Sequence, residues 1–130
     1  MPNGFHGTKE EWDRLQAPLR EVDEVIGEFA RVHDLDVDAN YHNMPSRRLI
    51  WHTREITHVI QVSLNDEDMT MYVSFYAWQD KNSVRRGTGL KQISGLSVPE
   101  LKSQLPGLLE EGYRLLESLS EAELEVWTAI

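Results

Sequence analysis

The sequence predicts an α+β fold: an antiparallel sheet of three to four strands in a meander, packed on one face against a long N-terminal helix and C-terminal helices. Apolar residues recur at helical spacing towards both ends of the chain, and β-rich segments with short turns lie between them. The chain has 130 residues and no Pro-rich or Gly/Ser-rich linker, so we expect one domain over residues 1–130.

The first expected element is a long amphipathic helix. Thr8 and Glu11 form a capping box, and apolar side chains then recur at steps of three and four. This stripe consists of Trp12, Leu15, Leu19, Val22, Ile26, Phe29 and His33. Pro18 lacks the N–H that an interior helical position donates, so we expect a kink or a new helix near it. The same spacing would suit a coiled-coil seam between two copies, which stays an alternative.

Three β-rich segments follow a polar connection over residues 34–47. Their sequences are RRLIWHT, ITHVIQVSL and MTMYVSFYAW, which are rich in the β-branched and aromatic residues that favour strands. Short connections separate them, at residues 54–55 and 65–68. Connections of this length are typical of antiparallel hairpins, so neighbouring segments should pair.

The register of these hairpins defines one apolar face. The first turn sets Trp51 opposite His58, and the second sets Leu64 opposite Met69. Both hairpins then place their apolar side chains on the same side. This predicted core face consists of Leu49, Trp51, Ile60, Val62, Leu64, Met69, Met71, Val73, Phe75 and Ala77.

The rest of the chain predicts a fourth, irregular edge strand and then helices. The segment SVRRGTGLKQIS contains Gly87 and Gly89, which allow a bulge or a close approach. Ser97 caps a helix start in SVPE. The apolar stripe of that helix is Leu101, Leu105, Leu108, Leu109, Leu115, Leu116 and Leu119. A second capping pattern, SEAE, predicts a last short helix that carries Leu124 and Trp127.

The formal charge of −9 is unevenly distributed. Residues 1–40 hold four basic and ten acidic side chains, residues 41–95 hold seven and five, and residues 96–130 hold two and seven. Proteins that bind phosphate backbones carry an excess of Lys and Arg, so we expect no nucleic-acid partner. The acidic ends would favour a basic partner, although glutamates on solvated helix faces give the same pattern.

Targeting and membrane signals are missing from the sequence. The apolar runs are too short to span a bilayer, and the first ten residues, MPNGFHGTKE, are polar and Gly-rich. Cysteine is absent, which fits a reducing compartment. We therefore expect a cytoplasmic protein without a membrane partner.

Two sequence patterns resemble metal-binding sites. Acidic residues alternate in HDLDVDANYH, residues 33–42, but Ala39 stands where a calcium loop needs Gly and Pro45 where it needs a bidentate Glu. The predicted register puts His52 and His58 on opposite faces, where they cannot share one ion. We expect His58 to be a core histidine with hydrogen-bonded ring nitrogens. We predict no metal and no cofactor.

The second face of the predicted sheet carries aromatic and small polar side chains. Tyr and Trp are enriched at binding surfaces, and an exposed apolar patch of about 400 Å² would indicate a partner. The predicted partner-binding residues are Ile50, Val59, Tyr72, Tyr76 and Trp78. The alternative is that the C-terminal segment, with Leu124 and Trp127, folds over this face and covers it.

No nucleophile elbow, cysteine nucleophile or readable carboxylate pair occurs, so we predict no catalytic residues and favour a non-enzymatic protein. We expect a protein-binding module, either a homodimer or an inhibitor-like or chaperone-like partner of another protein. In size and charge the chain is loosely similar to bacterial secretion chaperones and small immunity proteins, with no shared motif. The alternative is a small-anion-binding protein or enzyme, with a pocket between the second face and the C-terminal segment. Its predicted ligand-binding residues are Arg48, His52, Arg85 and Arg86.

Overall fold

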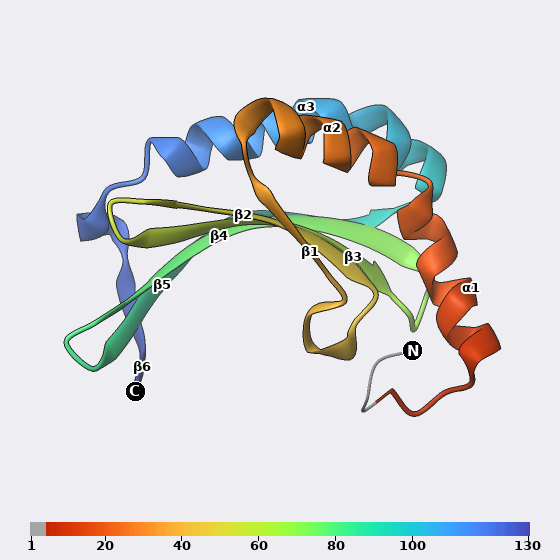
Figure 1. The fold of residues 1–130 in the computed structure, drawn as a ribbon, viewed down its shortest axis with the longest axis horizontal. Coiled ribbons are helices and arrows are strands. Elements are labelled where there is room, and N and C mark those ends of the chain that lie inside the picture. The colour runs from red at the N-terminus through yellow and green to blue at the C-terminus, as the bar shows by residue number, and fades with distance from the viewer. Residues whose placement is uncertain (1–4) are drawn as a thin grey trace.

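The structure, a computed structural model, describes residues 5–130. A six-stranded antiparallel sheet has its strands in chain order, and α2 and α3 lie over one of its faces (Figure 1). The helices are α1 (Lys9–Arg20), α2 (Asp23–His33) and α3 (Val98–Glu117). The strands are β1 (Asp36–Ala39), β2 (Ser46–Thr53), β3 (Ile56–Asn65), β4 (Thr70–Lys81), β5 (Val84–Leu96) and β6 (Glu125–Ala129). The α+β meander is confirmed, while the prediction of three to four strands was too low.

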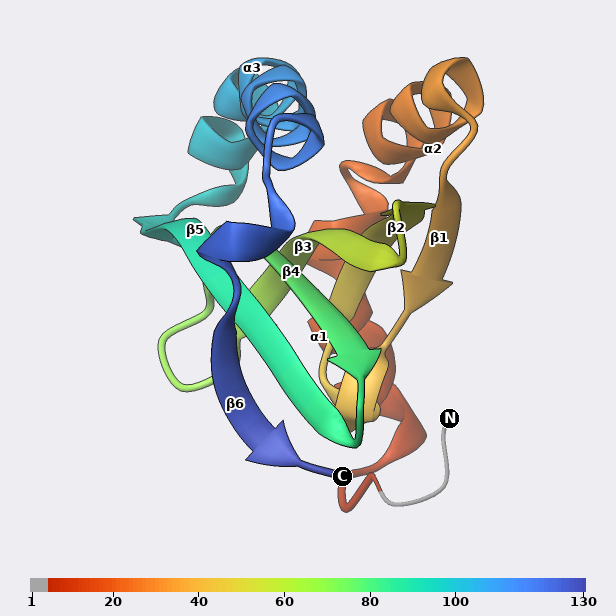
Figure 2. The same ribbon diagram turned by 90° about the vertical axis from the view of Figure 1, so that its left-hand side faces the viewer.

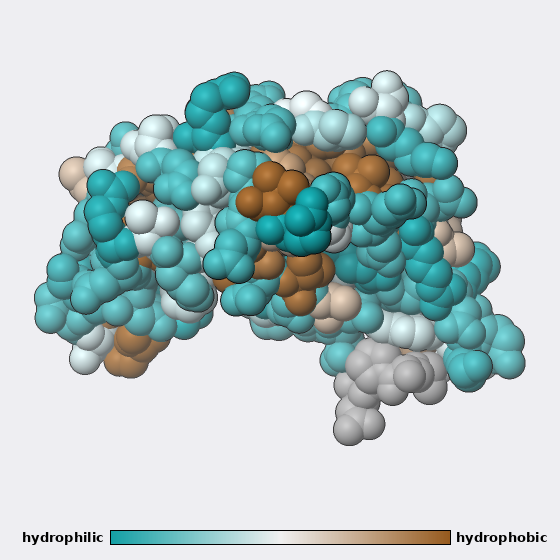
Figure 3. All heavy atoms as spheres, turned by 45° about the horizontal axis from the view of Figure 1, so that its top comes forward, coloured by the Kyte–Doolittle hydropathy of each residue, from teal (hydrophilic) through white to brown (hydrophobic). Residues whose placement is uncertain are grey.

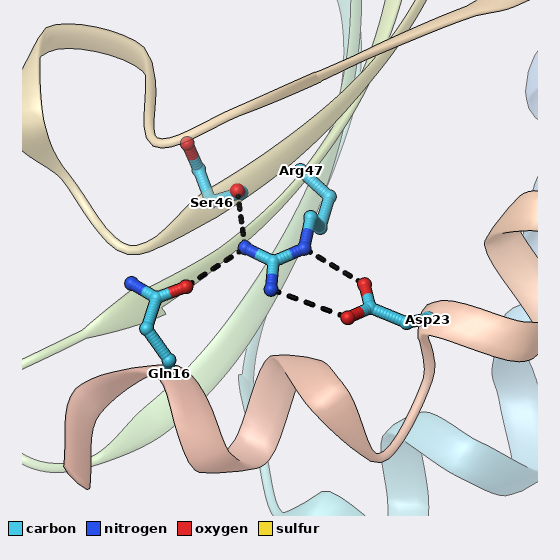
Figure 4. Close-up of polar contacts among 4 residues, drawn as sticks. All are labelled: Gln16, Asp23, Ser46 and Arg47. Atoms are coloured by element: carbon cyan, nitrogen blue, oxygen red, sulfur yellow. Dashed lines mark hydrogen bonds and ion pairs between the residues drawn. The ribbon is translucent and has the colours of Figure 1, made fainter. Parts of the chain in front are cut away.

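The predicted long N-terminal helix is two helices, and the break falls three residues after Pro18. α1 ends at Arg20 and α2 begins at Asp23, which lets the Asp23 carboxylate meet the Arg47 guanidinium from β2 (Figure 4). Arg47 Nε donates to Asp23 Oδ1 at 2.7 Å, and one terminal nitrogen donates to Gln16 Oε1 and to the Ser46 carbonyl, both at 2.9 Å. Arg47 lies on the helix side of the sheet and is 8% exposed. A buried charge needs such partners, so this cluster ties both helices to β2.

The first hairpin has the predicted register. Trp51 pairs with His58 across a two-residue turn. Arg54 and Glu55 in this turn both have positive φ, 53° and 66°, as the tight hairpin turn that matches strand twist requires.

The second hairpin is shifted by two residues from the predicted register. Leu64 pairs with Met71 rather than Met69, because the turn holds four residues and Met69 lies inside it. The Asp68 carboxylate accepts from the Thr70 backbone and hydroxyl, and Met69 adopts φ 60°. A shift of two leaves every side chain on its predicted face. Met69 itself was wrongly assigned to the core and is 39% exposed.

Two segments of the chain form strands that were not predicted. The polar connection after α2 contains β1, in which Val37 pairs with Leu49 of β2. The expected C-terminal helix is wrong, because one 3-10 turn over Glu121–Glu123 leads into β6. The sequence EVWTA alternates and is β-prone, and its pairing with the first residues of β5 outweighs the capping signal. β5 is therefore an edge strand only beyond Gly87.

The core lies between the sheet and the helices. Leu101, Leu105 and Leu109 of α3 are completely buried, as are Val73 and Phe75 of β4. α3 packs closely on the sheet at Gly112, where an added Cβ would lie 2.6 Å from the Phe75 ring. Apart from Met69, every member of the predicted core face is buried.

His58 is a core residue, but its polar surroundings differ from the prediction. The ring is fully buried and lies 5.2 Å from the Trp51 ring between centroids. Neither ring nitrogen has a hydrogen-bond partner among residues 5–130. Burial therefore lowers the pKa of His58, since a charged imidazolium would lose its hydration there.

Candidate functional site

The face of the sheet turned away from α2 and α3, here called the open face, carries no α-helix within residues 5–130. Its side chains follow from the strand register, which sets Arg48 of β2 beside Gln61 of β3, and Val59 of β3 beside Tyr76 of β4. In Figure 1 the β1–β2 connection and the outer ends of β5 and β6 extend below the sheet on this side. These segments therefore flank the open face (Figure 1).

A cavity of about 500 Å³ lies on the open face. It lies between the β1–β2 connection and β6, with β2, β4 and β5 contributing from the sheet. We call it the aromatic pocket, and its lining consists of Tyr41, Arg48, Tyr76, Trp78, Arg85 and Trp127. Four of these six side chains are aromatic and two are arginines.

Tyr41 is held in place by a strained connection. Asn40 and His42 on either side of it have positive φ, 62° and 53°. Asparagine tolerates this conformation better than most residues. The Tyr41 N–H donates to Ser46 Oγ at 3.0 Å, and the ring stacks on the Arg48 guanidinium with 3.6 Å between the guanidinium carbon and the ring centroid. These contacts fix the Tyr41 ring as one aromatic wall of the pocket.

Arg48 and Tyr76 form the polar floor of the pocket. Arg48 is bound by the Asp38 carboxylate of β1, while its Nε is buried with no partner among residues 5–130. Burial disfavours the Arg48 charge, but contacts with Asp38 and Tyr76 outweigh it and raise the pKa of the guanidinium. Burial also raises the pKa of Tyr76, against the opposing effect of Arg48. The neutral Tyr76 hydroxyl donates to Gln61 Oε1 at 2.7 Å.

The outer wall combines Trp78, Arg85 and Trp127. The Arg85 guanidinium lies 4.6 Å from the Trp78 ring centroid and forms a two-point ion pair with Asp80 at 2.7 and 2.8 Å. Trp127 fits against the backbone of Gly87, where an added Cβ would lie 2.5 Å from the indole. Trp127 remains 48% exposed, so it is available for contact.

The charges in the pocket are largely compensated. Each of its two arginines is paired with an aspartate of a neighbouring strand, Arg48 with Asp38 and Arg85 with Asp80. A free anion would have to compete with these carboxylates. The pocket therefore suits an aromatic or apolar side chain with a hydrogen-bonding tip better than a small anion.

The predicted site residues are only partly brought together. Tyr76, Trp78, Arg48 and Arg85, from both alternative predictions, line the same pocket. Ile50 and Tyr72 are half-buried on the open face and do not line it, and Val59, next to Tyr76 in the sheet, is completely buried. His52 is exposed, with its Nδ1 3.1 Å from the Thr57 hydroxyl, and Arg86 pairs with Gln79 on the opposite face from Arg85.

Two lining residues were not predicted as site residues. Tyr41 lies in the predicted polar connection, and Trp127 in the segment for which a helix is predicted. The sequence feature that could have indicated the position of Trp127 is Gly87 in the neighbouring strand, because a glycine there leaves the space that the indole fills. No pattern in the sequence around Tyr41 indicates where its side chain lies.

The acidic segment after α2 is structural in this fold. Asp34 ends α2 in a left-handed conformation with φ 56°, and Asp38 binds Arg48. Within residues 5–130, no three His, Asp or Glu side chains gather at metal-binding distance. None of the helices of this region has the length and apolar character needed to cross a membrane.

Comparisons of the chain with protein-family models, with curated proteins and with solved structures find no match.

Proposed function

We propose that this chain is a non-enzymatic protein-binding module whose contact surface is the open face, centred on the aromatic pocket. The composition of the pocket carries this proposal. Its lining uses only Trp, Tyr and Arg, the three residue types most enriched among side chains that dominate binding energy at protein interfaces. Such residues act best in a preformed depression that excludes water around an inserted side chain.

The anchoring of these side chains supports the same function. Arg48 is held between Tyr41 and Asp38, and Arg85 between Trp78 and Asp80. Side chains fixed before binding lose little conformational entropy when the partner arrives. The arginines keep their counterions on binding, which limits the cost of removing water from them.

The kind of partner follows from charge. The chain carries −9, so two copies repel each other at long range, while a neutral or basic protein does not meet this barrier. A different protein is therefore favoured over a homodimer.

The test replaces the pocket aromatics and measures association. Tyr76→Arg combined with Trp78→Arg should abolish capture of partners by the immobilised protein from cell extract, as quantified by mass spectrometry. Leu115→Arg, at an exposed position of α3, is the control and should capture the same proteins as wild type. Equal capture by wild type and the double variant, with unchanged circular dichroism, would contradict the proposal.

The size of the cavity favours one second candidate, a small-ligand-binding protein. About 500 Å³ falls within the range of ligand sites, and the buried Arg48 Nε has a hydrogen left to donate to a ligand. A thermal-shift screen against small anions and aromatic carboxylates tests it. A ligand should raise the melting temperature of wild type and not that of Trp127→Ala, by mass action.

A further inference from the structure

A second apolar depression lies on the opposite side of the molecule, between α2 and α3. Figure 2 looks at the ends of the two helices and shows them side by side above the sheet. They run in the same direction, because Glu21 contacts Lys102 at one end of the pair and His33 contacts Glu110 at the other, at 3.1 and 4.0 Å. The lining residues of the depression run from Glu24 to His33 along α2, about three helical turns, and from Pro106 to Glu110 along α3.

The floor of this depression, here called the helix groove, is apolar. It encloses about 490 Å³ and is lined by Val25, Phe29, Val32, Pro106 and Leu109, with polar side chains at its rim. Figure 3 shows hydrophobic surface in the hollow between the helices, bordered by hydrophilic side chains. Val32 is 60% exposed, so apolar area here stays in contact with water.

The rim of the helix groove is acidic. Glu24, Glu28 and Glu110 line it, and His33 is its only other ionisable side chain among the described lining residues. Arg31 neutralises Glu28 in part, with 2.7 Å between nitrogen and oxygen, and His33 reaches Glu110 only at 4.0 Å. Glu24 forms no ion pair within residues 5–130 and stays free for a cation from outside.

We propose that the helix groove binds a basic amphipathic helix of another protein. An apolar groove between two parallel helices accepts the apolar face of a third helix, which presents side chains at i, i+3 or i+4 and i+7. Lysines or arginines beside that face would meet Glu24 on one rim and Glu110 on the other. A second copy of this chain does not fit, since its own helices are acidic. The site is separate from the aromatic pocket, so the proposal does not depend on the function proposed for the open face.

The test uses a labelled synthetic peptide of about 18 residues, long enough to be helical, with leucines on one face and lysines elsewhere. A second peptide carries glutamate in place of lysine. In fluorescence anisotropy, wild type should bind the lysine peptide and reject the glutamate peptide. Glu24→Lys combined with Glu110→Lys should weaken binding of the lysine peptide by about tenfold or more and create binding of the glutamate peptide.

Two further variants separate the groove from general charge attraction. Glu10→Lys combined with Glu67→Lys changes the net charge equally at exposed sites outside the groove and should bind like wild type. Val32→Ser keeps the charge and should weaken binding, because it removes apolar area that the peptide would cover. Equal loss in the charge control, or no effect of Val32→Ser, would overturn the proposal. So would concentration-dependent self-association of wild type that Val32→Ser abolishes, because the occupant would then be a second copy.

Discussion

At the scale of single residues, the site depends on one glycine. Gly87→Ala places a Cβ 2.5 Å from the Trp127 indole, so we expect Trp127 to leave the pocket, with a local cost of about 1–3 kcal/mol. The indole N–H signal of Trp127, assigned by NMR with Trp127→Phe, should shift. Gly89→Ala is the matched control, because its added Cβ meets no atom within 4 Å. An unmoved Trp127 signal in Gly87→Ala would show that the indole does not lie where described.

His58 gives a prediction about pH at the same scale. Burial lowers its pKa below the model-peptide value of 6.5, so as pH falls the unfolded chain takes up the proton before the folded protein does. Stability is therefore complete above about pH 6.5 and declines below it, by at most about 1.4 kcal/mol per pH unit. Urea unfolding of wild type and His58→Phe at several pH values measures this. Between pH 6.5 and 5, the free energy of unfolding of His58→Phe should fall less steeply with decreasing pH than that of wild type. Identical slopes for the two proteins would refute the role of His58.

At the scale of elements, the Arg47 cluster fixes how α1 and α2 meet the sheet. Asp23→Ala leaves a buried guanidinium without its carboxylate and should lower the free energy of unfolding by about 2–3 kcal/mol. Arg47→Met removes the charge but keeps most of the volume, so it should cost less. The control is Arg31→Ala, which breaks an exposed ion pair with Glu28 and should change stability by about 1 kcal/mol or less. Denaturant unfolding measures the free energy of unfolding of each variant. An Asp23→Ala variant as stable as Arg31→Ala would contradict the proposed role of the Arg47 cluster.

Predictability from the sequence also varies among elements. Hairpin alternation predicted the faces of β2, β3 and β4 even where the register was two residues off, because side-chain direction repeats every two residues. Pro18 indicated a break in the N-terminal helix, and the break falls at residues 21–22. The contact of Asp23 with Arg47, which lies 24 residues further along the chain, is not indicated by any local pattern. β6 was missed because local capping and propensity signals disagree over residues 120–129, and pairing with β5 decides between them.

At the scale of the whole molecule, the two surfaces for which we propose binding lie on opposite sides of one fold. Alternation predicted Tyr76 and Trp78 on the open face, and the structure adds Tyr41 and Trp127 to the same pocket. Tyr41 and Trp127 belong to η1 (Tyr41–Asn43) and β6, which are distant in sequence. Only the fold brings them to the same pocket as the β4 residues. The helices on the other side carry many of the acidic residues of the two ends of the chain, which is why we propose a basic partner for that side.

Hydrogen–deuterium exchange of the chain with and without its captured partner tests the central claim most directly. If the open face is the contact surface, amides of the Tyr41 connection, the outer part of β4 and β6 should become more protected in the complex. This protection should be absent when the Tyr76→Arg and Trp78→Arg variant is mixed with the same partner. Protection confined to α2 and α3, or to elements remote from the aromatic pocket, would contradict the claim.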